Sequence, residues 1–465
     1  MQQTQVPSKA DHPNPERPKG PKPQRLILGH LPQFSADPLA TLDLAAQYGP
    51  LARLRFLNRT VHVLTEPEDV KHVLVDNHRN YTKGAGQLAL RDLLGEGLLN
   101  AEGAFHQRQR RLIQPAFHRS RIENYAKIID EETAKRLSQW QSGEQRDIHE
   151  EMMKLTLVII GRCLFDVDLT ADAARLGNAI GSLIENFRFG QIGPIGRFLA
   201  KMNRSYQREQ AGHLAVLDEA MYAIIRERRA DGEDRGDLLS MLLAAQEEDE
   251  ESGVLEGMSD QQVRNEAITL FSAGHETTAN ALTWTFFLLS QHPEIEARLH
   301  AQLYQVLGDP ANGTMPTLAH LPDLPYVRQV FSESMRLYPP AWIMGRTAIA
   351  DDVVAGVPIH AGTALLVSQY VTHRNPRYWP NPDQFDPERF APGVKPAHAY
   401  AYFPFGGGAR RCIGEPLAWM EGELILAAVA HRYRLGLVPG TVVVPQPRIT
   451  LRVEGGLPMI LEKRG

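Results

Sequence analysis

The segment from Phe403 to Gly414 places a lone cysteine, Cys412, behind three consecutive glycines and directly before a predicted helix. Glycines allow the backbone to fold tightly around the sulfur, so that N–H groups can point toward it. Pro416 suits the first turn of the helix, where the helix dipole favours an anion. The segment therefore predicts a buried thiolate with a lowered pKa. The alternative is a turn with a small buried residue, which is a common role for a cysteine behind glycines.

Composition excludes several classes of protein. Of the 465 residues, 43% are hydrophobic and 23% are charged, which excludes collagen-like, coiled-coil and wholly disordered chains. The net charge of -5 gives no broad basic field, so we expect no nucleic-acid partner. Two cysteines, Cys163 and Cys412, are too few for a disulfide framework or a zinc site and fit a reducing cytoplasm. No stretch offers the roughly 20 apolar residues of a membrane-spanning helix.

The order of predicted elements indicates a mainly helical α+β chain. Residues 1–24 alternate prolines with basic residues and are predicted to form a flexible leader. Residues 25–465 are predicted to form a single domain, in which a large helical part carries a smaller β-rich lobe. Helical spacing dominates between about residues 103 and 308. Strands are predicted at 51–57 and 60–64, with antiparallel hairpins at 357–371, around Gly362, and at 441–461.

A long helix is predicted at the centre of the chain. Ser259, with Gln262 three residues later, has the spacing of a capping box, and the apolar pattern continues to His292. The middle of this helix contains Gly274 and paired threonines, which have low helix propensity. A threonine hydroxyl can replace a backbone donor at an interrupted helical bond. The composition therefore predicts a local opening of the helix.

The ten residues from Phe405 to Gly414 match the pattern Phe-x-x-Gly-x-Arg-x-Cys-x-Gly. Here the chain resembles the cytochrome P450 family of heme-thiolate monooxygenases, of the soluble bacterial type. Three further segments match signatures of that family in its order: Ala273-Gly274-His275-Glu276-Thr277-Thr278, Glu333-Ser334-Met335-Arg336 and Pro387-Glu388-Arg389-Phe390. The resemblance extends from about residue 20 to residue 461 and implies the fold of the family.

The resemblance implies heme b, iron protoporphyrin IX, as the cofactor. Cys412 would be the metal ligand, with Phe405 beside the sulfur and Gly408 in the cofactor-binding loop. The residues that would bind the heme carboxylates are His106, Arg110, Arg346 and Arg410. A four-residue spacing places His106 and Arg110 on one face of a helix. Two alternatives stay open: Arg108 and Arg111 as the partners, or an arginine-rich helix face in solvent.

The resemblance also assigns catalytic and structural residues. Glu276 and Thr277 would pass protons to the distal oxygen. From the residues alone, a threonine in a helix is usually only tolerated and a glutamate is usually exposed. Glu333 and Arg336 would normally form a weak surface ion pair. The family implies instead that they join Arg389 in a buried structural cluster behind the heme.

The positions that match the family's substrate pocket are nearly all apolar. They are Leu88, Phe187, Ala273, Ala341, Trp342 and Ile343. We therefore expect a hydrophobic small-molecule substrate, such as a terpenoid, a carotenoid or a long-chain fatty acid, to be oxidised with O₂. The alternative is that these side chains belong to the core.

Electrons are expected to come from separate proteins. Two cysteines cannot hold an iron–sulfur cluster and no flavin-binding set is present, so a ferredoxin or flavodoxin with its reductase is predicted. One rival hypothesis is a peroxide-driven or redox-neutral heme-thiolate enzyme, such as a peroxygenase, isomerase or dehydratase. Another is a non-catalytic heme carrier or sensor. Glu276 and Thr277 favour the monooxygenase.

Overall fold

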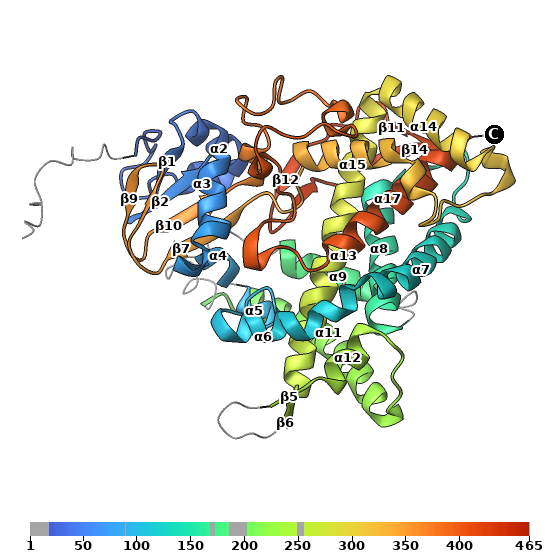
Figure 1. Cartoon of the computed structure of the whole chain (residues 1–465), viewed down its shortest axis with the longest axis horizontal. Coiled ribbons are helices and arrows are strands. Elements are labelled where there is room, and N and C mark those ends of the chain that lie inside the picture. Colours follow the sequence, from blue (N-terminus) through green and yellow to red (C-terminus); the bar gives the residue numbers. More distant parts are fainter. Residues whose placement is uncertain (1–17, 89, 168–172, 186–201, 249–254, 465) are drawn as a thin grey trace, which may run out of the picture.

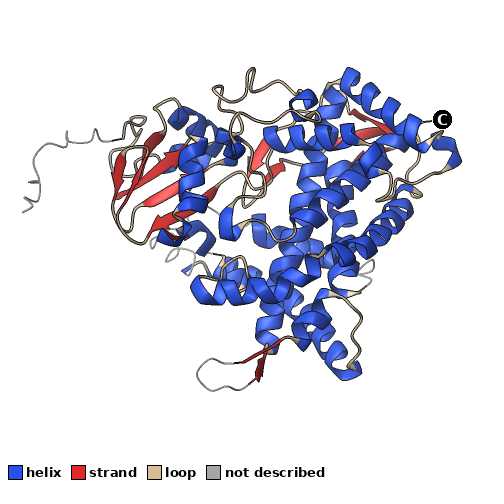
Figure 2. Cartoon of the chain, viewed as in Figure 1, coloured by secondary structure: helices blue, strands red, loops and turns tan. Residues whose placement is uncertain are grey.

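The computed structural model describes residues 18–88, 90–167, 173–185, 202–248 and 255–464. The predicted leader, residues 1–24, lies mostly outside these ranges. The helices gather around the central helix α13, and the largest sheet lies at one end of the molecule (Figures 1 and 2). This arrangement confirms the mainly helical α+β class. No helix in the described ranges has the length and hydrophobicity that crossing a bilayer requires.

The helices and strands have the following bounds. The longer helices are α2 (Pro38–Ala46), α6 (Gly103–Ile113), α7 (Arg119–Leu137), α8 (Ile148–Phe165), α9 (Ala173–Glu185), α11 (Arg204–Asp231), α13 (Asp260–Gln291), α14 (Pro293–Leu307), α15 (Pro325–Leu337) and α17 (Glu415–Arg432). The shorter helices are α1 (Leu31–Ala36), α3 (Pro67–Lys71), α4 (Ala85–Leu88), α5 (Arg91–Leu94), α12 (Leu238–Ala244) and α16 (Gln369–Thr372). The strands are β1 (Leu51–Phe56), β2 (Arg59–Leu64), β3 (Tyr81–Lys83), β4 (Gln145–Asp147), β5 (Gln246–Glu248), β6 (Leu255–Gly257), β7 (Met344–Ala348), β8 (Asp352–Val354), β9 (Val357–Ile359), β10 (Ala364–Val367), β11 (Tyr433–Leu437), β12 (Pro445–Pro447), β13 (Leu451–Val453) and β14 (Pro458–Lys463).

Helix α13 is the core of the helical part. The Ser259 hydroxyl accepts a hydrogen bond from the N–H of Gln262 at 3.2 Å and caps the helix at the predicted position. Leu282 and Trp284 are fully buried, and α13 packs against α8, α11 and α15. A helix buried on most of its faces fixes the positions of the side chains along it.

The largest sheet has the strand order β1-β2-β10-β7-β3. The two strands predicted at 51–57 and 60–64 occur as β1 and β2 and pair antiparallel, with Leu51 opposite Leu64. Strand β10 pairs in parallel with β2 and antiparallel with β7. The interior position suits β10 because Leu365 and Val367 are fully buried.

The predicted hairpin at 357–371 is wrong. Strand β9 pairs with β8 instead, across a tight turn in which Ala355 and Gly356 both have positive φ. Such a two-residue turn matches the twist of antiparallel strands, and it therefore closes the hairpin before β10 begins. Within 441–461, β12 and β13 form an antiparallel pair, whereas β14 pairs with β11 and β4.

Candidate active site

The Cys412 loop is folded by its glycines. The N–H of Cys412 donates to the carbonyl of Phe405 at 2.9 Å, which closes the loop on itself. Gly408 has φ +66°, and a Cβ there would lie 2.0 Å from the carbonyl oxygen of Leu74. Only glycine fits this close approach of two backbones. Helix α17 begins at Glu415, directly behind the cysteine.

The protein around Cys412 does not by itself produce a low thiol pKa. Burial raises the pKa of Cys412 to about 11, although a bond from the N–H of Gly414 and the charge of Arg110 act in the other direction. The residue as a whole nevertheless keeps accessible surface. The prediction of a lowered pKa is wrong for the protein groups alone, because desolvation outweighs the helix dipole. A cation bound at the sulfur would supply the missing stabilisation of the thiolate.

A cluster of cations lies between β3, β7 and the Cys412 loop. Lys83 and Arg346 are buried, and Arg410 forms an ion pair with Glu102. Burial and the neighbouring charge of Arg410 lower the pKa of Lys83 to about 7 and that of Arg346 to about 10. Burial is the larger cause of both shifts and Arg410 adds to it, so an anion bound here would favour the charged form of Lys83.

Lys83 is a site residue that the sequence analysis missed. Its Nζ donates to the carbonyl oxygens of Leu98 at 3.2 Å and Ala101 at 2.8 Å. A signal was present, because alternation along β3 puts Lys83 on the same face as the buried Tyr81. A lysine on the buried face of a strand indicates a nearby anion or a set of acceptors.

His106 and Arg110 lie on one face of α6. His106 is buried, and desolvation together with Arg410, Lys83 and Arg110 lowers its pKa to about 4. It is therefore neutral at pH 7 and offers a ring N–H rather than a charge. Arg110 Nη1 donates to the carbonyl of Arg411 at 2.8 Å, beside Cys412. His106 thus borders the cation cluster, and Arg110 borders the Cys412 loop.

The middle of α13 keeps accessible surface on one side. Ala273 is exposed and Thr277 is half-buried, whereas His275 between them is fully buried. The predicted opening of the helix is not observed, because α13 is continuous and Thr277 Oγ1 donates to the carbonyl of Ala273 at 2.8 Å. The hydroxyl adds a bond to an intact helix rather than replacing one. Gly274 has a packing role, since a Cβ there would lie 2.7 Å from Ile160 of α8.

Glu276 points into a buried polar cluster beside β13. Its Oε1 accepts hydrogen bonds from Arg452 Nε at 2.7 Å and from the Thr450 hydroxyl. Asn280 Nδ2 donates in turn to Thr450 Oγ1 at 3.1 Å. Burial would raise the pKa of Glu276, but Arg452 and the two hydrogen bonds more than compensate, and its pKa lies below the usual value. Glu276 is thus a fixed carboxylate, and Arg452 is a second residue that the sequence analysis missed.

The structure brings Glu333, Arg336 and Arg389 together. Arg336 donates to both carboxylate oxygens of Glu333, at 2.7 and 2.8 Å, and both side chains are fully buried. Arg389 Nε lies 3.4 Å from Glu333 Oε1, and the N–H of Asp386 donates to the same oxygen at 3.0 Å. Arg389 Nη2 donates to the carbonyl of Asn381 at 3.0 Å, so each of the three side chains has a hydrogen-bond partner within the protein.

The residues predicted for the substrate pocket fall into different surroundings. Ala341 is exposed, and Ile343 is half-buried. Trp342 does not line a pocket: its ring is fully buried in the core beneath α1 and α2, and its indole N–H donates to the carbonyl of Arg448 at 3.0 Å. A large ring with a satisfied N–H suits a core. Phe187 lies outside the described residues, as does the side chain of Leu88.

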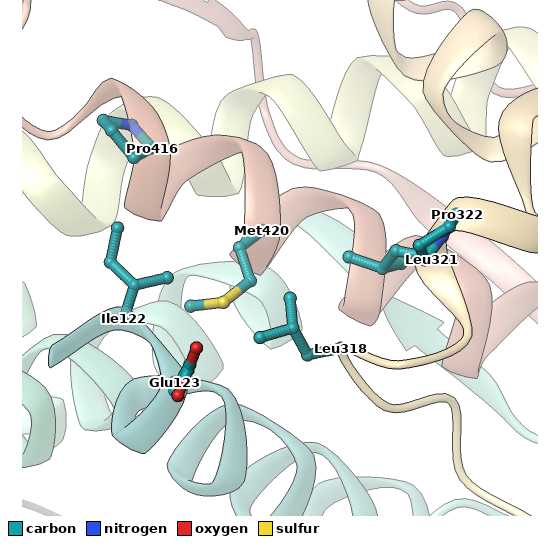
Figure 3. Close-up of a pocket in the computed structure, with 7 residues that line it drawn as sticks. All are labelled: Ile122, Glu123, Leu318, Leu321, Pro322, Pro416 and Met420. Atoms are coloured by element: carbon teal, nitrogen blue, oxygen red, sulfur yellow. The ribbon is translucent and has the colours of Figure 1, made fainter. Parts of the chain in front are cut away.

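A surface pocket of about 480 Å³ lies between α7, α17 and the segment before α15 (Figure 3). Its lining is mostly apolar and consists of Ile122, Glu123, Leu318, Leu321, Pro322, Pro416 and Met420. None of the predicted site residues belongs to it. We therefore assign it no role in the chemistry.

Comparison with known proteins gives consistent matches over nearly the whole chain. The family model "Cytochrome P450" matches residues 18–455. The chain is 39% identical to cyclooctatin synthase of Streptomyces melanosporofaciens over 94% of both chains. It is 38% identical to cyclooctat-9-en-7-ol 5-monooxygenase of the same species, over 99% of this chain and 98% of the relative. It is 33% identical to pentalenene oxygenase of Streptomyces avermitilis, over 90% of this chain and 91% of the relative.

Proposed function

The chain belongs to the cytochrome P450 family and is a monooxygenase, and on that premise we propose that it inserts one oxygen atom from O₂ into a terpenoid. The substrate class rests on the names of three relatives. One is named after cyclooctatin, one after the alkenol cyclooctat-9-en-7-ol and one after the alkene pentalenene. The apolar stretch at Ala341 and Ile343 supports the same class. Carotenoids and fatty acids, which the sequence left open, have less support.

The described residues fit a heme. A thiolate at Cys412 is a ligand for heme iron, and the positive metal would offset the desolvation that raises the thiol pKa. Lys83, Arg346 and Arg410 lie around the carboxylate of Glu102, and this cluster would offer cationic donors to the heme propionates. His106 and Arg110 would donate N–H groups beside them. We propose heme b; when bound, it supplies the oxidising chemistry that O₂ requires.

Replacing Lys83 by Met should weaken heme binding. Loss of a charge-assisted hydrogen bond in a buried site costs about 1.5–3 kcal/mol, which corresponds to roughly tenfold or more in affinity. The measurement is the rate of heme transfer from the purified protein to excess apomyoglobin, which should rise by about that factor. Lys71→Met is the control, because Lys71 is half-exposed and its ion pair with Asp76 lies at the surface. Equal transfer rates for the two variants would contradict the assignment.

Thr277 and Glu276 of α13 would transfer protons rather than bind the substrate. Thr277 holds its hydroxyl at a fixed place through its bond to Ala273, on the accessible side of the helix. We propose that this hydroxyl would deliver a proton during the reduction of dioxygen, and that Glu276 would supply it. Ala273, which has no bulky side chain, would leave the room that dioxygen and a substrate need.

Replacing Thr277 by Ala should divert reducing equivalents from product into hydrogen peroxide. We expect product formed per NADPH to fall by about tenfold or more, because positioned proton donors contribute on the order of 100-fold or more to such steps. The control is Thr283→Ala, since Thr283 makes the same hydroxyl bond to the carbonyl four residues earlier, at 2.7 Å, but is fully buried in the core. Unchanged coupling in Thr277→Ala would defeat the proton role.

We propose a separate ferredoxin or flavodoxin with its reductase as the electron donor and the cytoplasm as the location, since both cysteines are free. The donor would dock beside Cys412, where Arg111 and Arg411 are exposed. The test of function is a binding screen by heme spin state, followed by turnover with O₂ and a reductase chain. A terpenoid that shifts the spin state and is hydroxylated supports the proposal. Equal turnover with peroxide alone would favour a peroxygenase, and a shift by fatty acids only would replace the substrate class.

A further inference from the structure

We propose that Arg452 is a positioning residue for oxygen activation, because it holds the carboxylate of Glu276 in one direction and as an anion. The proposal rests on the proposed function only in that Glu276 supplies the proton. Arg452 lies on β13, whereas Glu276 lies on α13, and the two are 176 residues apart in sequence.

The contacts form a closed and buried network. Arg452 is 4% exposed and Glu276 is 1% exposed, so bulk water does not screen their ion pair. Thr450 donates to the same oxygen, Oε1, and accepts from Asn280, which is fully buried. Two side chains, Arg452 and Thr450, therefore orient the carboxylate directly, and of these only Arg452 contributes a charge.

The other charged groups around Glu276 are few. His275, on the same helix, is fully buried and keeps Nδ1 on the carbonyl of Phe271 at 2.9 Å. His149, at the start of α8, lies close enough for Glu276 and Arg452 to affect its pKa in opposite directions. Burial lowers the pKa of both histidines, so both are neutral at pH 7. Arg452 is thus the cation that keeps Glu276 ionised.

Stability alone does not account for the pair. Strand β13 is already tied to its surroundings, because the N–H of Leu451 donates to Pro340 at 2.9 Å and its carbonyl accepts from the Trp284 indole at 3.0 Å. Buried ion pairs add little net stability relative to apolar side chains of similar size. Glu276 is directly before Thr277 in the sequence, and its buried negative charge therefore points to a role in the proton transfer.

The step is a proton transfer only. Glu276 would take up a proton from water and pass it to the Thr277 hydroxyl, which would release its own proton toward dioxygen as electrons from the separate redox partner reduce it. Arg452 sets how readily Glu276 takes up and releases that proton. Without Arg452, burial would dominate and the pKa of Glu276 would be raised above its usual value rather than lowered.

The first test is an infrared pH titration of the heme-loaded protein without substrate. Wild type should show no protonated Glu276 between about pH 6 and pH 8, because Arg452 and its hydrogen bonds hold the pKa of Glu276 below the usual value. Arg452→Leu should gain the C=O band of a protonated carboxyl in that range, and the band should vanish in the double variant with Glu276→Gln. Arg452→Lys should restore the ionised state. The absence of any new band in a folded, heme-loaded Arg452→Leu variant would overturn the proposal, whatever the substrate proves to be.

The second test measures product formed per NADPH against pH. In wild type, product formed per NADPH should be constant between about pH 6 and pH 8. Arg452→Leu should lower this ratio by about tenfold and make it depend on pH through one new ionisation. Arg434→Leu is the control, because Arg434 pairs with Glu462 at the exposed edge strand β11. If Arg452→Leu does not fold, Thr450→Val removes a donor without removing a charge and should change the ratio in the same direction by less. A flat profile at the wild-type ratio in the folded variants would also overturn the proposal.

Discussion

The Cys412→Ser variant is expected to lose the red-shifted Soret band of the reduced carbon-monoxide complex and, with it, monooxygenase turnover. Serine has nearly the shape of cysteine, and the loop is closed by backbone contacts such as the N–H of residue 412 on Phe405, so the fold should persist. The hydroxyl is far less acidic than a thiol and donates less electron density to iron. We expect product formation to fall by on the order of 100-fold or more, since the thiolate is what favours cleavage of the O–O bond.

The matched control is Cys163→Ala, which should keep both the spectrum and the turnover. Cys163 is buried in α8, and burial keeps its thiol protonated with a pKa well above the usual value. Absorption spectra of both reduced variants under carbon monoxide, recorded at equal heme content, decide the matter. If the serine variant kept the red-shifted band, Cys412 would not be the ligand.

Sequence patterns predicted those parts of the molecule that short segments determine. The cap at Ser259 and the strands β1 and β2 depend on neighbouring residues, and all three occur where expected. Gly408 was also assigned to the loop from its pattern, but the reason for a glycine there lies elsewhere, in the backbone of Leu74. A motif therefore identified the position without supplying its physical cause.

Contacts between distant segments could not be predicted in the same way. The parallel pairing of β10 with β2 depends on which strand the buried side chains of Leu365 and Val367 need as a neighbour, and no local turn specifies it. The partner of Glu276 is equally non-local, because an arginine in a short C-terminal strand gives no sign that it is buried. For this reason the sequence indicated an acid beside Thr277 but not its charge state.

Replacing Arg336 by Leu should cause the largest loss of stability among these variants. Arg336 is fully buried and, besides its two bonds to Glu333, donates to the carbonyls of His373, Pro382 and Gln384. Its removal would leave Glu333 as a buried carboxylate with only the more distant Arg389 and one backbone N–H. Breaking a buried ion pair in this way costs about 3–5 kcal/mol. The free energy of unfolding in urea, measured with heme content, should fall by that amount.

A second ion pair with the same three-residue spacing provides the control for Arg336 and Glu333. Lys135 and Glu132 are also three residues apart on a helix, but Lys135 is half exposed and its Nζ lies 3.8 Å from the carboxylate. Lys135→Met should therefore change the free energy of unfolding by less than about 0.5 kcal/mol, because Lys135 lies in solvent and Glu132 keeps its ion pair with Arg162. Because Arg336 holds three carbonyls of the chain that leads into the Cys412 loop, its loss should also lower heme content, whereas the Lys135 variant should retain it. Equal stability of the two variants would show that the buried cluster does not support the fold.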